Sequence, residues 1–111
     1  MKLPNADRAV VDIAKLQDYC LSPHHPRGRH KASVFSEALG ITQSDAEILK
    51  GALIKAAKNS EATLAEKDKY GQRYVVDFEM RGIQGNAVQV RSSWIILVGE
   101  NFARLTSCCV I

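Results

Sequence analysis

The sequence predicts an α+β fold, with about three N-terminal helices packed on a C-terminal antiparallel β-meander of three to four strands. Apolar residues recur at helical spacing through residues 1–60, whereas from residue 73 onward they recur at every second position, the period of a strand. Short glycine-containing turns join the predicted strands, and such connections favour antiparallel neighbours. The helices are therefore expected to cover one face of the sheet and to leave the other face open.

The chain has 111 residues, of which 46% are hydrophobic and 24% are charged. These values are ordinary for a globular protein and argue against disorder. The sequence contains no internal repeat and no low-complexity segment. We therefore expect a single domain over residues 1–111, large enough to bury a core of its own.

Two helices are predicted before residue 41. Asp12 is a suitable N-cap for the first helix, which must end before Pro23 and Pro26 because proline cannot continue a helix. The second helix begins near Arg29. It ends at Gly40, since glycine readily takes the left-handed conformation that closes a helix.

The third predicted helix has the most regular apolar stripe in the sequence. The segment from Ser44 to Glu47 matches a capping box, in which two side chains bond each other's backbone N–H groups. The stripe that follows ends before residues 59–60. Residues 61–71 are polar and charged, and we expect them to form a surface loop.

Three strands are expected after this loop, over residues 73–80, 88–98 and 102–110. Alternation directs one set of apolar side chains toward the helices: Tyr74, Val76, Phe78, Val88, Val90, Trp94 and Ile96. The opposite face is predicted to carry three arginines and two hydroxyl groups: Arg73, Arg91, Arg104, Ser93 and Thr106. Drawn from neighbouring strands, these groups can converge on one phosphate-sized spot.

A simpler interpretation of this open face is a polar surface on which the arginines only pair with Asp77 and Glu79. That alternative is weaker for Arg91 than for the other two arginines. Arg91 lies in the middle of its strand near Trp94, where a merely solvated charge has less reason to be.

Residues 22–36 form a cationic segment that holds all three histidines, Arg27, Arg29 and Lys31, and no acid. Its charge of +3 equals the net charge of the whole chain, so the positive excess is local. The start of the second predicted helix also falls here, and its free N–H groups favour anions. Such a segment attracts phosphate, which arginine can bind through two parallel hydrogen bonds.

His30 is the candidate general acid or base of the cationic segment. Its spacing to Val34 and Ala38 predicts a ring on the covered side of the helix, near the rim, whereas Arg29 is expected to face solvent. A half-buried histidine beside cations can exchange a proton near neutral pH. A histidine that only caps a loop carbonyl fits the sequence equally well.

His24 and His25 flank prolines in a predicted loop, where a structural or solvated role is favoured. Metal binding by His24, His25 and His30 is disfavoured, because no carboxylate or cysteine lies nearby at ligand spacing. We expect no metal and no other cofactor.

Other sequence features argue for a cytoplasmic protein without a membrane anchor. No apolar run approaches the ~20 residues that a membrane-spanning helix needs, and the N-terminal residues do not resemble a secretory signal. The three cysteines fit neither a disulfide framework nor a zinc site, so a reducing compartment is expected. The last four residues, Cys-Cys-Val-Ile, match a prenylation pattern. They continue the alternation of the last strand and follow no polybasic stretch, so coincidence is the favoured explanation.

Five blocks of sequence, spread over nearly the whole chain, carry a resemblance: residues 3–6, 25–32, 70–74, 90–95 and 104–106. They resemble a family of small bacterial proteins built on a domain of unknown function, found alone or at the ends of toxin-like polypeptides. The Gly-Arg-His-Lys and Arg-Ser-Ser-Trp blocks are the most specific. The layout is similar to that of the ribonuclease toxins that include barnase, EndoU, colicin nuclease domains and RelE. This resemblance implies a toxin-like fold and does not by itself assign an activity.

The first functional hypothesis is a metal-independent endoribonuclease of the bacterial toxin type, which cleaves RNA by attack of the 2′-OH. Such cleavage needs a base for the 2′-OH, cations for the phosphorane charge and an acid for the leaving 5′-oxygen. We assign His30 as base or acid, Lys31 and Arg91 to the phosphate charge, and Ser93 or Thr106 to positioning. The flanking RNA backbone is assigned to four further side chains: Arg27, Arg29, Arg73 and Arg104.

The second hypothesis is a non-enzymatic protein that binds a partner, such as a cognate antitoxin or immunity protein. The cationic segment would then dock on an acidic protein surface. This hypothesis accounts better for the modest net charge of +3, which is low for a toxin that cuts RNA. Sequence-specific DNA binding is a more distant alternative, because no recognition helix with exposed base-reading residues is evident.

Overall fold

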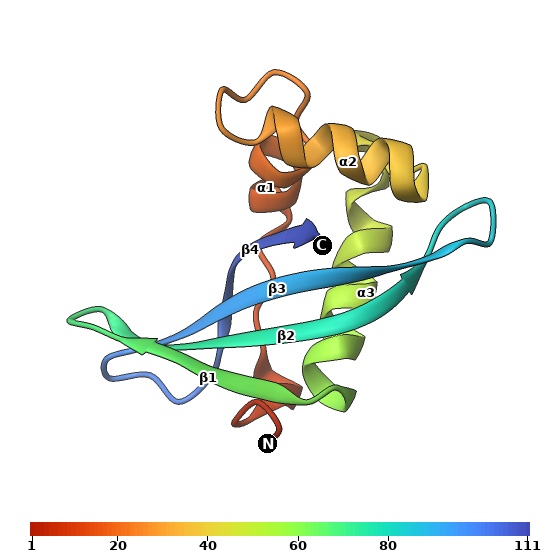
Figure 1. Ribbon diagram of the computed structural model, residues 1–111. Helices are drawn as coiled ribbons and strands as arrows, with labels where there is room; N and C mark the ends of the chain where they lie inside the picture. The colour runs from red at the N-terminus through yellow and green to blue at the C-terminus, as the bar shows by residue number, and fades with distance from the viewer.

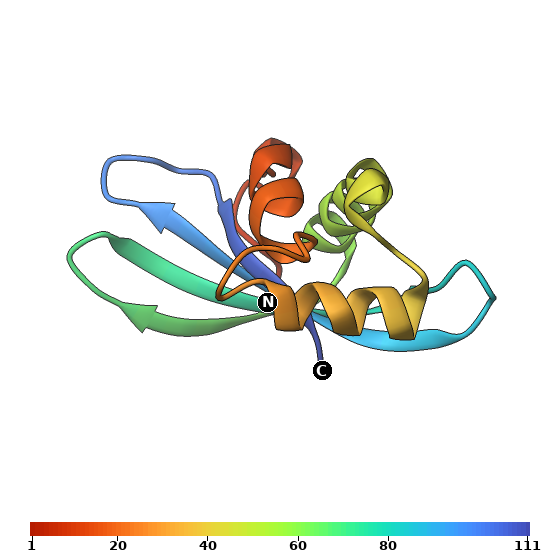
Figure 2. The same ribbon diagram turned by 90° about the horizontal axis from the view of Figure 1, so that it is seen from above.

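The computed structural model describes residues 1–111 and confirms the α+β layout, with helices in the first half of the chain and a sheet in the second. Figure 1 shows the sheet crossing in front of the helices, and Figure 2 shows α1 and α3 on one side of it. The helical elements are α1 (Ile13–Lys15), α2 (Arg29–Leu39) and α3 (Ala46–Asn59). Shorter turns precede or extend them: 3₁₀ turns at Ala6–Arg8 and Gln43–Asp45, and a π-helical turn at Leu16–Cys20.

The sheet is a four-stranded antiparallel meander in the order β1-β2-β3-β4. Its strands are β1 (Ala62–Lys67), β2 (Gly71–Arg81), β3 (Ala87–Leu97) and β4 (Arg104–Val110). The prediction of a loop over residues 61–71 was wrong, because β1 lies there. Only Ala62 of β1 is buried, so this short edge strand lacks the apolar alternation by which a strand is recognised.

The N-cap of the first helix and the C-terminal end of the second lie where the sequence predicts them. The Asp12 carboxylate accepts a hydrogen bond from the Ala14 N–H at 3.0 Å, which confirms it as the N-cap. The helix then widens into its π-helical turn, which Leu21 closes by donating to the Leu16 carbonyl at 2.8 Å. Gly40 follows α2 with φ of 69°, the left-handed conformation expected of it.

The capping box of the third helix differs from the prediction. It is formed by Thr42 and Asp45: the Thr42 N–H donates to Asp45 Oδ2 at 2.9 Å, and the Thr42 side chain takes part in return. The predicted pair of Ser44 and Glu47 was therefore wrong by two positions. A 3₁₀ turn precedes α3, so the chain enters the helix earlier than the apolar stripe indicates.

The hydrophobic core lies between the helices and the sheet face that carries Trp94. The indole is fully buried, and its N–H donates to Ser92 Oγ at 2.8 Å, while the Ser92 hydroxyl donates to the Val76 carbonyl at 2.7 Å. The largest side chains buried with it are Phe35, Leu16, Leu21, Leu39, Ile41, Leu49, Leu53 and Leu105. No helix of the structure combines the length and apolar character needed to cross a membrane.

An irregularity between β3 and β4 decides which β4 side chains share a face with which β3 side chains. Ser93 lies opposite Ser107, but Trp94 lies opposite Leu105, so Thr106 is an extra residue in β4. Beyond this bulge, Ser107 and Cys109 occupy the face that points away from Trp94. We call this the outer face.

Candidate functional site

A side-chain hydrogen bond links the cationic segment to the sheet. Lys31 lies in the first turn of α2, and its ammonium group donates a hydrogen bond to Ser107 Oγ at 2.7 Å. The same ammonium lies 5.0 Å from the centre of the Tyr19 ring, within range of a cation–π interaction. Both contacts fix a partly buried positive charge where α2 meets β4.

Strand register arranges the neighbours of Ser107 in rows on the outer face. Ser107 lies opposite Ser93, and Ser93 opposite Val75. In the next row, Arg91 lies between Asp77 and Cys109. Opposite residues in a sheet have side chains on the same face, about 5 Å apart. Lys31 and Ser107 therefore lie beside the strand row that holds Arg91.

Each of the three outer-face arginines has a carboxylate partner of its own. The Arg91 guanidinium donates two hydrogen bonds to Asp77, both 2.9 Å, which lowers the pKa of Asp77. Asp68 accepts from Arg73 at 3.1 Å, and Glu100 accepts twice from Arg104 at 2.8 Å. The three arginines therefore do not converge on one empty spot.

Arg73 and Arg104 form a separate row, because both lie opposite Ile95. They flank the row of Ser93 and Ser107 on the side away from Arg91. The Thr106 hydroxyl also has a structural partner, since it donates to the Ser93 carbonyl at 3.0 Å across the bulge. Along the outer face the rows therefore run from Arg91, through the two serines, to Arg73 and Arg104.

His30 does not lie where its helical spacing predicted. It is exposed and lines an open polar pocket of 570 Å³. The other residues of this pocket are Pro23, Arg29, Ser33, Ser36 and Glu37. The covered side of α2 carries Ala32, Phe35 and Leu39 instead, so the predicted orientation of His30 was wrong. Arg29 is exposed, as expected.

His25 supports the loop that leads into α2. Its Nδ1 atom accepts hydrogen bonds from the backbone N–H groups of Arg27 and Gly28, both at 3.0 Å. Its ring packs edge-on against Tyr19, with the ring centres 4.8 Å apart. Nδ1 is thereby occupied as an acceptor, which agrees with the structural role expected of this histidine.

Two buried cysteines lie beneath the Lys31–Ser107 contact, and sequence reasoning missed them. Hydrogen bonding from the thiol and backbone of Cys108, together with the nearby Lys31 charge, lowers the pKa of Cys20 to about 6. In turn, its contact with Cys20 and its burial raise the pKa of Cys108. The only signal in the sequence is that each of the two cysteines occupies a core-facing position of its element, where both are buried.

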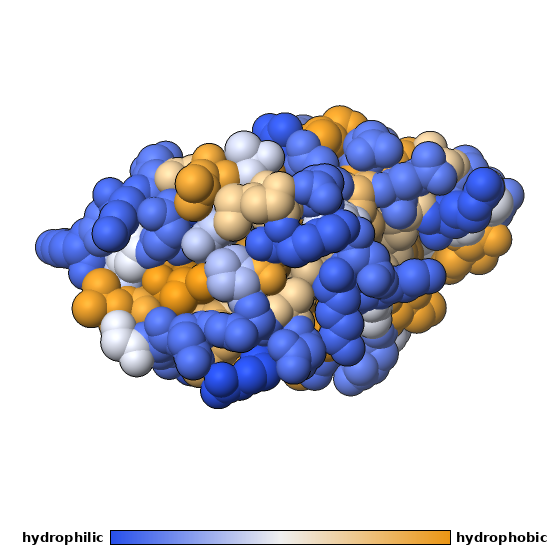
Figure 3. Space-filling view, turned by 90° about the horizontal axis from the view of Figure 1, so that it is seen from below, coloured by the Kyte–Doolittle hydropathy of each residue, from blue (hydrophilic) through white to orange (hydrophobic).

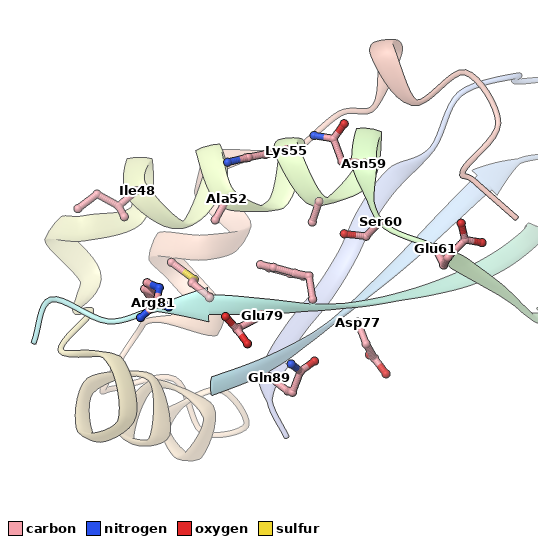
Figure 4. A pocket seen from close by; sticks show the side chains of 13 residues that line it. Ile48, Ala52, Lys55, Asn59, Ser60, Glu61, Asp77, Glu79, Arg81 and Gln89 are labelled. Atoms are coloured by element: carbon pink, nitrogen blue, oxygen red, sulfur yellow. The ribbon is translucent and has the colours of Figure 1, made fainter. Parts of the chain in front are cut away.

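The structure shows no group of three or more His, Cys, Asp or Glu side chains arranged to hold a metal ion. Seen from below, the surface is mostly hydrophilic, with apolar side chains in separate groups (Figure 3). Another pocket, of 710 Å³, lies between α3 and β2 (Figure 4). The predicted site residues do not line it, and no sequence motif indicated it.

Comparison with known proteins places the fold. A similar solved structure is a chain of a contact-dependent growth inhibition toxin–immunity protein complex from Klebsiella pneumoniae 342. The TM-score is 0.70 at 16% sequence identity, and the match covers 95% of each chain. No curated protein matches the sequence. The profile of the family described as "Domain of unknown function (DUF6883)" matches residues 2–111, and the chain therefore belongs to the DUF6883 family.

Proposed function

We propose that this protein is a metal-independent endoribonuclease of the bacterial toxin type, acting in the cytoplasm at the outer face beside the start of α2. The contact of Lys31 with Ser107 carries the proposal, because it joins the acid-free cationic segment to the polar sheet face. The fold shared with a chain of a toxin–immunity complex supports a toxin-like role.

Lys31 is the cation best placed to stabilise a phosphorane. Its ammonium has three donors, and Ser107 Oγ uses one of them. The remaining N–H bonds can meet the non-bridging oxygens of a phosphate that lies over Ser107 and Ser93. A fixed donor is worth more in the transition state than a mobile one, because it needs no reorganisation during the reaction.

His30 is the base of the proposed reaction. It follows Arg29 in the same turn of α2, and its exposed ring is accessible to a nucleic acid lying across the helix start. The ring takes the proton of the 2′-OH, the 2′-oxygen bonds to phosphorus, and the bond to the 5′-oxygen breaks. Water protonates the leaving oxygen at this open site. The products are a 2′,3′-cyclic phosphate and a 5′-hydroxyl.

The other basic residues bind the flanking backbone. Arg27 and Arg29 are exposed at the start of α2. Arg73 and Arg104 lie on the far side of the serine row, and Arg91 on the near side. Their carboxylate partners leave donors of each guanidinium free for phosphate, since a guanidinium carries five N–H bonds. Ser93 and Thr106 complete the polar surface between them.

The test is cleavage of an end-labelled RNA by the purified protein in EDTA. We expect Lys31→Met and His30→Ala to lower the rate by about a hundredfold or more, with melting temperatures close to wild type. Lys58→Met is the matched control, because Lys58 is exposed in the last turn of α3, and it should cleave like wild type. A wild-type protein that never cuts RNA would refute the proposal.

A binding protein of the immunity type is the second candidate. It is favoured by the carboxylate partners of the three outer-face arginines and by the net charge of only +3. Expression in bacteria separates the two. Growth arrest that His30→Ala relieves supports the nuclease, whereas harmless expression and co-purification of an acidic protein support the binder.

A further inference from the structure

We propose that the edge of β2 over residues 77–81 takes an extended segment of a partner protein as an additional β-strand, with α3 as the wall of the groove. β1 pairs with β2 only between Gln72 and Val76, whereas β3 pairs with β2 as far as Arg81. The last five residues of β2 therefore have a strand on one side only. Figure 4 shows β1 starting beyond Glu61, short of the part of β2 that carries Glu79 and Arg81.

The direction of the backbone groups follows from hydrogen bonds at the other end of β2. Asp68 N–H donates to the Gly71 carbonyl on the β1 side, and Val98 N–H donates to the Tyr70 carbonyl on the β3 side. Successive residues of an antiparallel strand direct their N–H and C=O groups to opposite sides. The register between β2 and β3 continues without a break, so residues 77, 79 and 81 direct their N–H and C=O groups to the open edge.

These backbone groups have no hydrogen-bond partner elsewhere in the protein. Among the backbone hydrogen bonds outside helices and strands, none involves residues 77, 79 or 81. The next residue of this segment to make one is Gly82, whose N–H donates to the Asn86 carbonyl. An open edge of this kind is a template for another strand. Five residues at ~3.3 Å each give a site about 17 Å long, the length of an ordinary strand.

The groove beside this edge is apolar on the side where a strand would need it. Phe78 and Met80 form its floor on the sheet, and Ile48, Ala52 and Ala56 form its wall on α3. Ile48 is 55% exposed, so its side chain is accessible to an added strand. A strand laid along the edge would point every second side chain into this groove, so those side chains should be apolar.

The charges of β2 determine which side chains are favoured at the other positions of the added strand, those that lie on the outer face. Asp77 is paired with Arg91, and Glu61 with the N-terminal amine and Lys2. Glu79 has no ion-pair partner in the protein and lies on the outer face, where it would stand opposite a residue of the added strand. Opposite charges across a strand pair are stabilising. The occupant is therefore a segment with alternating apolar residues and a lysine or arginine opposite Glu79.

The test is selection of binders from a phage-displayed library of random dodecapeptides. Glu79→Pro serves as the counter-target, because it removes both determinants at this position, the N–H that points to the open edge and the Glu79 carboxylate, and leaves the β2–β3 ladder intact. Enriched peptides should carry apolar residues at every second position and a lysine or arginine at the position opposite Glu79. In nuclear magnetic resonance spectra they should shift the amides of residues 77, 79 and 81 more than those of residues 78 and 80.

Two helix variants test the wall of the groove. Ala52→Lys should weaken binding of the selected peptides by at least about tenfold, since it places a charge against the apolar side of the strand. Gly51→Lys is its matched control, because residue 51 is exposed and a Cβ atom added there meets nothing within 4 Å, and it should bind like wild type.

Three results would overturn the proposal. One is a selection that yields no peptide, and another is a set of peptides that bind wild type and Glu79→Pro equally. The third is self-association of the protein, in analytical ultracentrifugation, that Glu79→Pro abolishes, because a second copy of this chain would then be the occupant. The Lys31→Met variant keeps the edge of β2 intact, so the selected peptides should bind this variant like wild type. This result is expected whether or not the wild-type protein cuts RNA.

Discussion

The Lys31 ammonium lies 2.7 Å from the Ser107 hydroxyl, although the two residues are 76 positions apart in the sequence. This hydrogen bond places a cation from the start of α2 on the outer face of the sheet. The same ammonium lies over the Tyr19 ring, 5.0 Å from the ring centre. Packing of α2 against β4 thus creates a site that neither element has alone.

The close approach of Gly28 to Tyr19 positions this lysine, so Gly28→Ala should destabilise the protein. A Cβ atom at residue 28 would lie 2.0 Å from the Tyr19 carbonyl oxygen, which forces the start of α2 outward. We expect a loss of roughly 1–3 kcal/mol in the free energy of unfolding, measured by urea denaturation.

The matched control for this variant is Gly51→Ala in the exposed face of α3. A Cβ there meets nothing within 4 Å, so the higher helix propensity of alanine should raise stability by roughly 0.5–1 kcal/mol. Equal effects of the two substitutions would show that the contact with Tyr19 does not constrain the start of α2.

Adjacent serines in β3 should respond differently to alanine, because they lie on opposite faces. Ser92→Ala leaves the buried Trp94 indole N–H without an acceptor, which should cost about 1–3 kcal/mol in urea denaturation. Ser93→Ala should change stability by less than ~0.5 kcal/mol, because no group of the protein forms a hydrogen bond with the Ser93 hydroxyl. RNA cleavage should instead fall in Ser93→Ala. A larger loss of stability in Ser93→Ala would contradict the register of β3.

Asp77 is expected to compete with RNA for Arg91. Asp77→Asn removes a charged partner that accepts two hydrogen bonds, so the guanidinium becomes available to phosphate. Fluorescence anisotropy with a non-cleavable 2′-O-methyl oligonucleotide should show tighter binding in Asp77→Asn and weaker binding in Arg91→Met. Because the pair is exposed, urea denaturation should show little change in stability in either variant. Weaker binding in both variants would mean that Asp77 only positions Arg91.

The Cys20–Cys108 pair should make stability depend on pH. The pKa of Cys20 falls to about 6 in the folded protein, from an ordinary value of 9.0. Between these values the unfolded chain binds the extra proton, so the free energy of unfolding rises with pH. Above pH 9 the sign reverses, because the raised pKa of Cys108 keeps its proton on the folded chain while the unfolded chain loses it.

Urea denaturation between pH 6 and 10 in a reducing buffer measures this dependence. Cys20→Ala should flatten the rise between pH 6 and 9. Cys109→Ala is the control and should keep it, because the buried pair stays intact. A rise that persists in Cys20→Ala would assign it to another group.

The sequence predicts the order of the elements well because local rules set most of their boundaries. The Asp12 N-cap and the left-handed Gly40 both depend only on nearby backbone. β1 escaped prediction because a strand at the edge of a sheet, exposed on nearly all its side chains, has no apolar period. Its pairing with β2 is a property of the folded sheet.

Prediction of the site was poorer for reasons of geometry. The one-residue bulge in β4 puts Ser107 where simple alternation puts Thr106. His30 lies outside the buried stripe of α2 because that stripe runs through Ala32, and the two positions between them turn a side chain by about 200°. The contact between Lys31 and Ser107 joins distant segments, so no local pattern could have indicated it.

Cleavage of RNA and of the all-2′-deoxy oligonucleotide of the same sequence, both in EDTA, tests the central claim most directly. Attack by the 2′-OH at the Lys31 site predicts that the RNA is cut to fragments ending in 2′,3′-cyclic phosphate. The deoxy strand should bind and stay whole. Cleavage of both strands, or of neither, would contradict the account.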